Sequence, residues 1–138
     1  MNGYAAVARD VNDAGLVVRY SFPTQGCPDA VVWTTVAGRK TGIHILPSLG
    51  GCGAEAYGVN NDGDVVGCAA TSRGYWRPAR WTVGPDGTAS SVRDLGSPTP
   101  NVSGIGYHVS ARIAGVAQVA GFLNTTSGST QATLWTIR

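Results

Sequence analysis

Residues 54–67, with the sequence AEAYGVNNDGDVVG, place a tight turn between two runs of small and branched apolar residues. Branched residues such as Val favour strands, and Asn, Asp and Gly tolerate the positive φ that short hairpin turns require. The segment 61–63 therefore predicts a turn between antiparallel strands. Four strands are expected in this part of the chain: Ala54–Asn60, Asp64–Ala70, Arg77–Val83 and Ser91–Leu95.

The hairpin recurs at the spacing of three tryptophans. Trp33 and Trp81 are 48 residues apart, and Trp135 follows after 54 more. A shift of 48 residues also aligns residues 15–18 (GLVV) with residues 63–66 (GDVV), so that the glycine and both valines coincide. Self-similarity at such a period indicates a repeat architecture. We expect one β-repeat domain over residues 1–138, with three units at approximately 4–51, 52–103 and 104–138.

The predicted fold class is therefore all-β, with three four-stranded antiparallel repeat units arranged as propeller-like blades. A triangular β-prism-like packing of three sheets is the alternative. The segment Val109–Ala120 alone has apolar residues at helical spacing, but the repeat predicts strand, turn and strand there. Only three residues follow Trp135, so the third unit is expected to lack its outer strand.

Composition narrows the function classes. The net charge is +2 and charged residues make up 13% of the chain, which argues against nucleic acid as a partner. The densest cationic group, Arg73, Arg77 and Arg80, is more typical of a solvated strand face than of a phosphate-binding patch. No apolar run is long enough to span a bilayer, and no basic-then-apolar leader opens this chain.

The chain has three cysteines, so one of them has no partner if the other two form a disulfide. In the blade arrangement, Cys27 and Cys52 lie in loops that emerge on the same face, so we expect a disulfide between them, with three reduced thiols as the alternative. Cys68 aligns with the apolar strand positions Tyr20 and Phe122 and is interpreted as a buried hydrophobe. A disulfide would favour an oxidising compartment, which makes an extracellular or cell-surface location the expectation.

Candidates for metal binding and catalysis are few. Asp62 and Asp64 lie in a turn that resembles a short acidic calcium loop, but calcium needs six to eight oxygens and the other two copies have fewer carboxylates. We expect a hairpin turn, with neither metal nor cofactor, and keep calcium as a weak alternative. His44 and His108 are isolated, and Asp29 with Glu55 is the one carboxylate pair conceivable near one face. No catalytic residue is predicted.

One segment lies outside the repeat pattern. Trp76, in the segment Arg73-Gly74-Tyr75-Trp76-Arg77, does not coincide with the other tryptophans. Loop aromatics of this kind either pack onto a neighbouring blade or bind a sugar face or a protein partner. The candidate ligand-binding residues are therefore Arg73, Tyr75, Trp76 and Arg77.

The unit resembles the HAF-type repeat of bacterial extracellular proteins, whose units look like propeller blades and are largely without an assigned activity. Arg19 departs from the pattern, because glycine stands at the equivalent positions 67 and 121. So does Ile45-Leu46-Pro47, which replaces Asp-Leu-Gly. The resemblance is carried by Ala56, Gly58, Val59, Asn60, Gly63, Val65, Val66, Gly67, Trp81 and Asp94-Leu95-Gly96.

The number of units bears on function. Closed propellers usually have four to eight blades, so three should not close alone. We expect a non-catalytic interaction or scaffolding module that associates with itself, for example as a dimer that completes a six-bladed ring. A lectin-like module that binds carbohydrate through loop aromatics is the second reading, and an enzyme on a propeller scaffold is the least favoured.

Overall fold

A computed structural model describes residues 3–23 and 26–138 of the chain. These residues form three antiparallel sheets of four, four and three strands and no helix, so none of them belongs to a helix that could cross a membrane. The all-β fold with three sheets is confirmed. The strands are β1 (Gly3–Val11), β2 (Leu16–Pro23), β3 (Asp29–Val36), β4 (Arg39–Ile45), β5 (Gly50–Val59), β6 (Asp64–Thr71), β7 (Trp76–Val83), β8 (Ala89–Asp94), β9 (Gly104–Val109), β10 (Ala117–Asn124) and β11 (Thr130–Ile137).

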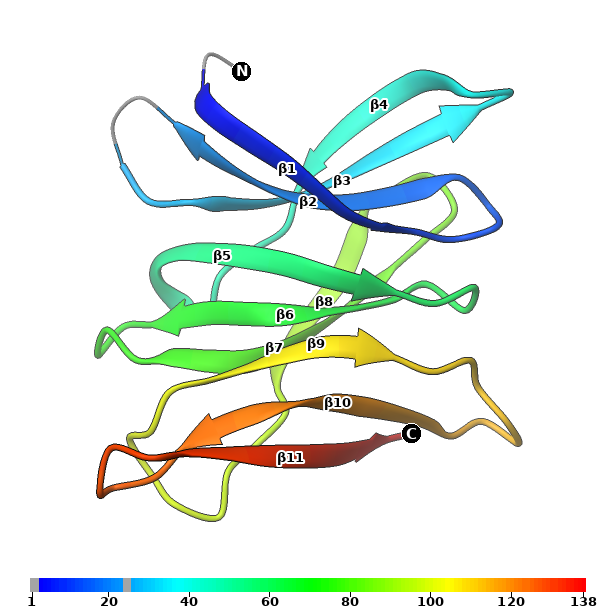
Figure 1. Cartoon of the computed structure of the whole chain (residues 1–138). Helices are drawn as coiled ribbons and strands as arrows, with labels where there is room; N and C mark the ends of the chain where they lie inside the picture. The colour runs from blue at the N-terminus through cyan, green and yellow to red at the C-terminus, as the bar shows by residue number, and fades with distance from the viewer. Residues whose placement is uncertain (1–2, 24–25) are drawn as a thin grey trace.

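Each sheet is a meander in which consecutive strands pair: sheet 1 is β1-β2-β3-β4, sheet 2 is β5-β6-β7-β8, and sheet 3 is β9-β10-β11. The sheets stack in sequence order, with β5 against sheet 1 and β9 against sheet 2 (Figure 1). Sheet 2 lies between the other two. The triangular arrangement, in which every sheet would pack on both others, is therefore wrong. In the part of the chain that the structure describes, the third sheet has three strands, so the outer strand is missing as expected and the prediction of four strands in every unit is wrong for the third.

The same turn joins the first two strands of sheets 1 and 2. The side-chain oxygen of Asn12 accepts the backbone N–H of Leu16, and that of Asn60 accepts the N–H of Asp64, both over 2.9 Å. The Asn60 oxygen also accepts the backbone N–H of Asp62 over 3.0 Å, which is the bond of an Asx turn. The helical spacing within Val109–Ala120 is misleading, because β9 ends at Val109 and β10 begins at Ala117. The connecting turn there is longer than in the other two sheets.

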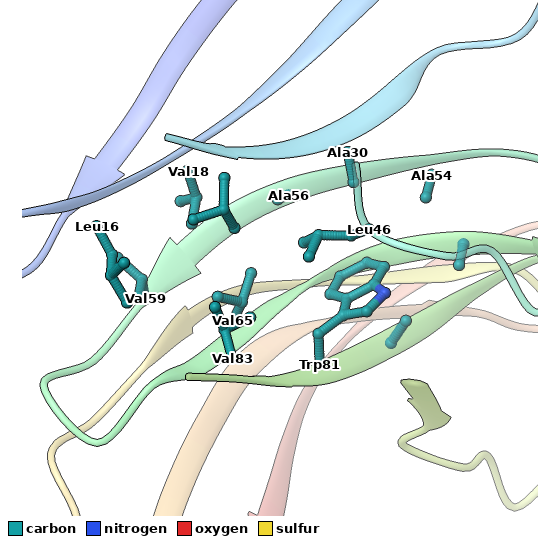
Figure 2. Close-up of a cluster of buried hydrophobic side chains, with 13 residues drawn as sticks. Leu16, Val18, Ala30, Leu46, Ala54, Ala56, Val59, Val65, Trp81 and Val83 are labelled. Carbon is teal, nitrogen blue, oxygen red and sulfur yellow. The ribbon is translucent and has the colours of Figure 1, made fainter. Parts of the chain in front are cut away.

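The first core lies between sheets 1 and 2 (Figure 2). Leu16 and Val18 project from sheet 1, and the fully buried Trp81 projects from sheet 2 together with Val65. Ala79, Trp81 and Val83 alternate along β7 with Arg80 and Thr82, and all three face this core. We call the tryptophan-bearing side of each sheet its front face and the opposite side its back face.

A second core lies between sheets 2 and 3. Val66 on the back face of sheet 2 packs with Val119 and Trp135, which lie on the front face of sheet 3. Both junctions therefore have the same polarity, since the front face of one sheet covers the back face of the preceding sheet. Two faces have no neighbouring sheet within the described chain: the front of sheet 1 and the back of sheet 3.

Candidate functional site

A row of paired apolar side chains crosses the front face of sheet 2. Val59 pairs with Val65, Val65 pairs with Trp81, and Trp81 pairs with Val92 of β8. Directly paired residues of antiparallel strands project to the same side. Val59, Val65 and Trp81 are buried because sheet 1 covers this face. The row is thus the surface through which sheet 2 contacts its neighbour.

The equivalent row on the front face of sheet 1 has no covering sheet. It runs from Val11 through Val17 and Trp33 to Ile43, and Ile45 lies beside it on β4. Val11 is 59% exposed and Ile45 is 57% exposed, although the matching Val59 is buried. A row that is core in one sheet is therefore surface in another.

The tryptophan N–H groups show the same difference. The Nε1 atom of Trp81 donates a hydrogen bond to the Pro47 carbonyl over 2.8 Å, and that of Trp135 donates to the Gly96 carbonyl over 2.9 Å. Each acceptor belongs to the segment that follows the last strand of the preceding sheet. The buried Nε1 atom of Trp33 has no partner among the described residues. A buried N–H without an acceptor is costly.

Two cations lie over Trp33. The guanidinium of Arg19 is 4.5 Å from the centre of the indole ring, and the ammonium of Lys40 is 5.4 Å from it. Burial lowers the pKa of Arg19 below its usual value. At the equivalent position sheet 2 has Gly67, where an added Cβ would collide with the Glu55 carbonyl oxygen on the neighbouring strand β5. The front of sheet 1 is therefore apolar with a cationic centre.

The back face of sheet 3 carries Ala120 and Leu134 beside the polar side chains of His108, Gln118 and Thr136. Leu134 of β11 is 66% exposed, and its register partner Ala120 on β10 is also exposed. Ala120 matches Val66, and Leu134 matches Arg80, in the chain's own repeat. Within the described residues β11 pairs only with β10, so its outer edge is open as well.

Hydrogen bonds link the turns of successive sheets at one end of the stack. The amide of Asn12 donates to the Asn60 carbonyl over 3.0 Å, and the amide of Asn60 donates to the Ser110 carbonyl over 2.8 Å. Asp13 and Asn61 are also joined, through the Asp13 N–H and the Asn61 amide. These contacts define the spacing between sheets.

Asp64 is the centre of a buried ionic cluster. Its side chain, which is 2% exposed, lies 2.7 Å from the Arg80 guanidinium and 2.8 Å from that of Arg112. Burial alone would raise the pKa of Asp64, but hydrogen bonds from Arg112, Asn60 and Arg80 lower it below its usual value. The cluster joins sheet 2 to the first turn of sheet 3.

This cluster bears on the calcium alternative. Asp64 accepts from two guanidinium groups, and Asp62 accepts the backbone N–H of Arg112 over 3.0 Å. The described residues contain no group of three His, Cys, Asp or Glu side chains that could hold a metal ion. The turn therefore uses its carboxylates to bind arginine and backbone groups of its own chain.

A disulfide joins Cys27, in the β2–β3 connection, to Cys52, the pairing favoured by the sequence. Cys52 lies in β5 and not in a loop, so the bond fixes sheet 1 to sheet 2. Trp76 is near it, because a Cβ added to Gly53 would be 3.0 Å from both Cys27 Cβ and the Trp76 ring. The disulfide indicates an oxidising environment. Burial raises the pKa of the free Cys68 thiol to about 12.

The candidate residues of segment 73–77 are only partly available for a ligand. Trp76, half-buried, packs near the disulfide, and Arg77 is buried. The Arg77 guanidinium donates to Asp94 over 2.8 Å and to the Val102 carbonyl over 2.7 Å. Arg73 and Tyr75 line a hollow of about 280 Å³ beside them. The tryptophan that prompted the ligand hypothesis therefore has a packing partner.

The structure does not bring the possible catalytic groups into hydrogen-bonding contact. His44 lies on β4 against Gly87, and His108 lies on β9. Asp29 begins β3, and Glu55 of β5 accepts a hydrogen bond from the hydroxyl of Tyr57. Among the described residues, none of these side chains is hydrogen-bonded to another of the four.

A continuous line of aromatic rings crosses all three sheets. The centroids of Tyr20 and Tyr57 are 5.8 Å apart, those of Tyr57 and Tyr107 are 5.2 Å apart, and those of Tyr107 and Phe122 are 5.9 Å apart. Phe22 extends the line beyond Tyr20 at 5.4 Å. We call these five residues the aromatic stripe. Several of its rings are partly exposed, which is unusual for a line of this length.

Arg9 lies at the centre of the aromatic stripe. Its guanidinium is 4.9 Å from the Tyr20 ring centre and 5.2 Å from that of Tyr57, and it donates to the Tyr20 hydroxyl over 2.7 Å. A hollow of about 340 Å³ is lined by Arg9, Tyr57, Tyr107 and His108. Burial, followed by the bond to Glu55, raises the pKa of Tyr57, so this hydroxyl stays protonated.

The sequence analysis missed the aromatic stripe, although a signal for it existed. Arg9 and Tyr57 are one repeat step of 48 residues apart, and Tyr107 follows Tyr57 by 50 residues. All three occupy the first strand of their sheets. Equivalent residues on neighbouring repeats must lie near one another, so large side chains at that position predict a line across the stack.

No protein-family model matches the chain, and no curated protein sequence matches it.

Proposed function

We propose that the chain is a non-catalytic interaction module of HAF-type, propeller-like blades that associates with a second copy of itself. The front face of sheet 1 in one copy packs on the back face of sheet 3 in the other. The observation that carries the proposal is the uncovered front row of sheet 1, where Val11 is 59% exposed although the equivalent Val59 of sheet 2 is buried.

The two junctions inside the chain supply the template for this contact. Both join a front face to a back face, and the two uncovered faces are one of each kind. A second copy can therefore repeat the front-to-back packing at each end of the stack, without the tryptophan N–H bond, because the described residues of sheet 3 include no fourth strand and no segment equivalent to Pro47 or Gly96. Two chains joined in this way at both ends form a ring of six blades, within the usual range of closed propellers.

The chemistry of the uncovered faces supports association and limits its strength. Val11, Ile43 and Ile45 offer exposed apolar surface on sheet 1, and Leu134 offers it on sheet 3. Arg19 replaces the glycine found at the internal junctions, so a covering sheet must accommodate a guanidinium. We therefore expect an association weaker than the internal junctions and dependent on concentration.

The location follows from the disulfide. Bonds such as Cys27–Cys52 persist in oxidising compartments, so the module is proposed to act outside the cell or at its surface. The HAF-type resemblance, which belongs to bacterial extracellular proteins, supports the same location. Carbohydrate is the second candidate partner class, favoured by the aromatic stripe more than by the segment 73–77.

The test is the mass of the particle in solution, measured by size-exclusion chromatography with light scattering over a range of concentrations. The wild type is expected to approach twice the chain mass of 14.2 kDa as concentration rises. Leu134→Glu places a charge in the proposed contact and should remain a monomer. Ile113, 81% exposed in the long turn of sheet 3, provides the control Ile113→Glu, which should associate like the wild type.

A wild type that keeps the mass of one chain at the highest soluble concentration would contradict self-association. Equal association of Leu134→Glu and the wild type would show that the back face of sheet 3 is not the contact. Circular dichroism of both variants checks that each substitution leaves the fold unchanged, as the exposure of both positions predicts.

A further inference from the structure

The aromatic stripe has a polar centre whose groups are arranged for an anion. Arg9 and His108 line the same hollow as the faces of Tyr57 and Tyr107. Among the described residues the Arg9 guanidinium makes one hydrogen bond, which it donates to the Tyr20 hydroxyl. A guanidinium presents five N–H donors, so most of them are free to bind a planar carboxylate in the two-bonded geometry that arginine favours.

The surroundings restrict the anion to one with few charges. Glu55 is bonded to the Tyr57 hydroxyl, and Asp10 accepts the Val59 N–H over 2.9 Å. The two carboxylates come from β1 and β5, two of the three strands that line the hollow. A polyanion such as a nucleic acid backbone would be repelled by them, because like charges in a partly buried site cost free energy.

The angles between the rings favour a sugar over stacked nucleic acid bases as the ligand. Tyr57 and Tyr107 meet at an interplanar angle of 80°, and Tyr20 and Tyr57 meet at 49°. Successive stacked bases need aromatic side chains that serve as parallel platforms. Rings tilted in this way instead form an angular, apolar wall, against which the C–H face of a single pyranose ring packs.

We infer that the hollow lined by Arg9, Tyr57, Tyr107 and His108 binds a uronate, a sugar that carries one carboxylate on its pyranose ring. The carboxylate is bound by the Arg9 guanidinium with His108 beside it, and the sugar face packs on Tyr107. The volume of about 340 Å³ suits one or two sugar rings. The uronate is thus a specific ligand within the carbohydrate class proposed above, and the hollow is its binding site. Its binding does not depend on self-association.

The experiment is a nuclear magnetic resonance titration of the full chain with trigalacturonate, with the neutral trisaccharide α-1,4-galactotriose as the matched probe. Trigalacturonate is expected to bind, with shifts at Arg9, Tyr57 and Tyr107, and galactotriose at least about tenfold more weakly because it lacks the carboxylates. Arg9→Gln and Tyr107→Ala should each weaken trigalacturonate binding about tenfold. His108→Ala tests the hollow independently should Tyr107→Ala fail to fold.

Arg39→Gln and Tyr75→Ala are the matched controls, because Arg39 is exposed in β4 and Tyr75 lies in the segment 73–77. Both should bind trigalacturonate like the wild type. Equal affinity for the two trisaccharides, no binding of either, or full binding by Arg9→Gln would overturn the inference. So would loss of binding in Tyr75→Ala alone, or tighter binding of an oligothymidylate, which would assign the stripe to single-stranded nucleic acid.

The same titration on Leu134→Glu separates this inference from the proposed function. Leu134 does not line the hollow, but it shares a back-face row of sheet 3 with Ala120 and His108, so the hollow borders the proposed contact and stays open in a monomer. Trigalacturonate should therefore bind a monomeric Leu134→Glu variant like the wild type. Normal binding by a chain that never associates would contradict the proposed function alone, and association without binding would contradict the uronate site alone.

Discussion

The indole N–H of Trp81 donates a hydrogen bond to the carbonyl oxygen of Pro47 over 2.8 Å. Trp81 belongs to sheet 2, and Pro47 follows the last strand of sheet 1, so this bond joins two repeats across their interface. Trp135 makes the equivalent bond to Gly96 over 2.9 Å. The repeated tryptophan therefore anchors each sheet to the chain segment that leads into it.

Replacement of Trp81 should be far more costly than replacement of Trp33. Trp81→Phe leaves the Pro47 carbonyl without its donor and opens a cavity in the first core, which should lower the free energy of unfolding by about 2–4 kcal/mol. Trp33→Phe, at a half-exposed site without a hydrogen-bond partner, should cost about 1 kcal/mol or less. Urea unfolding of both variants, at concentrations where the chain is monomeric, measures the difference. Equal losses would contradict this account of the interface.

Loss of the disulfide should destabilise the junction between sheets 1 and 2. Cys27 and Cys52 are 25 residues apart, and closure of a loop of that length contributes about 3 kcal/mol. The double variant Cys27→Ser and Cys52→Ser should lose about that amount in urea unfolding. Reducing agent should have the same effect on the wild type and none on the double variant. The control Cys68→Ala removes the free thiol and should leave the response to reductant unchanged.

Asp64 should be among the most sensitive positions of the chain. Asp64→Asn removes the charge that faces Arg80 and Arg112 in a buried setting, and breaking such a cluster costs about 3–5 kcal/mol. Thermal and urea unfolding measure the loss. Asp13→Asn, in the matching exposed turn of sheet 1, is the control and should change stability by less than about 1 kcal/mol. Similar losses of stability for both variants would show that the buried ionic cluster contributes no more than an exposed carboxylate.

Stability should fall in acid because of the same carboxylate. The pKa of Asp64 is lowered in the folded state, so its contribution is fully present above its unfolded pKa of about 3.9 and is lost as pH falls through the lower folded value. The wild type should therefore lose stability below about pH 4. Asp64→Asn should show a shallower decline over that window in pH-dependent urea unfolding. A decline of equal slope would place the titrating group elsewhere.

The local features of the fold could be predicted from the sequence because they depend on neighbours along the chain. The turn at Asn61–Gly63 and the alternation around Trp81 both follow from backbone preferences within a few residues. The three-sheet division follows from the spacing of the tryptophans. The pairing of Cys27 with Cys52 needed one further step, namely that loops of adjacent repeats emerge on the same side.

Features that lie between sheets could not be predicted in the same way. Asp64 binds Arg112, which belongs to the most divergent repeat and has no counterpart in the other two. Trp76 looked free for a ligand because the residue that its ring lies against, Gly53, is 23 positions away in sequence. The helical spacing within Val109–Ala120 was misleading because an elongated turn there carries apolar residues to the surface, among them Ile113.

The polarity of the sheet stack has one more consequence. A self-complementary contact between identical patches ends once two molecules have met, whereas a front-to-back contact leaves a free front at one end and a free back at the other. Whether such a chain closes or grows is decided only by the angle between successive sheets. A substitution that changes this angle, with both faces intact, would turn a closed particle into a filament.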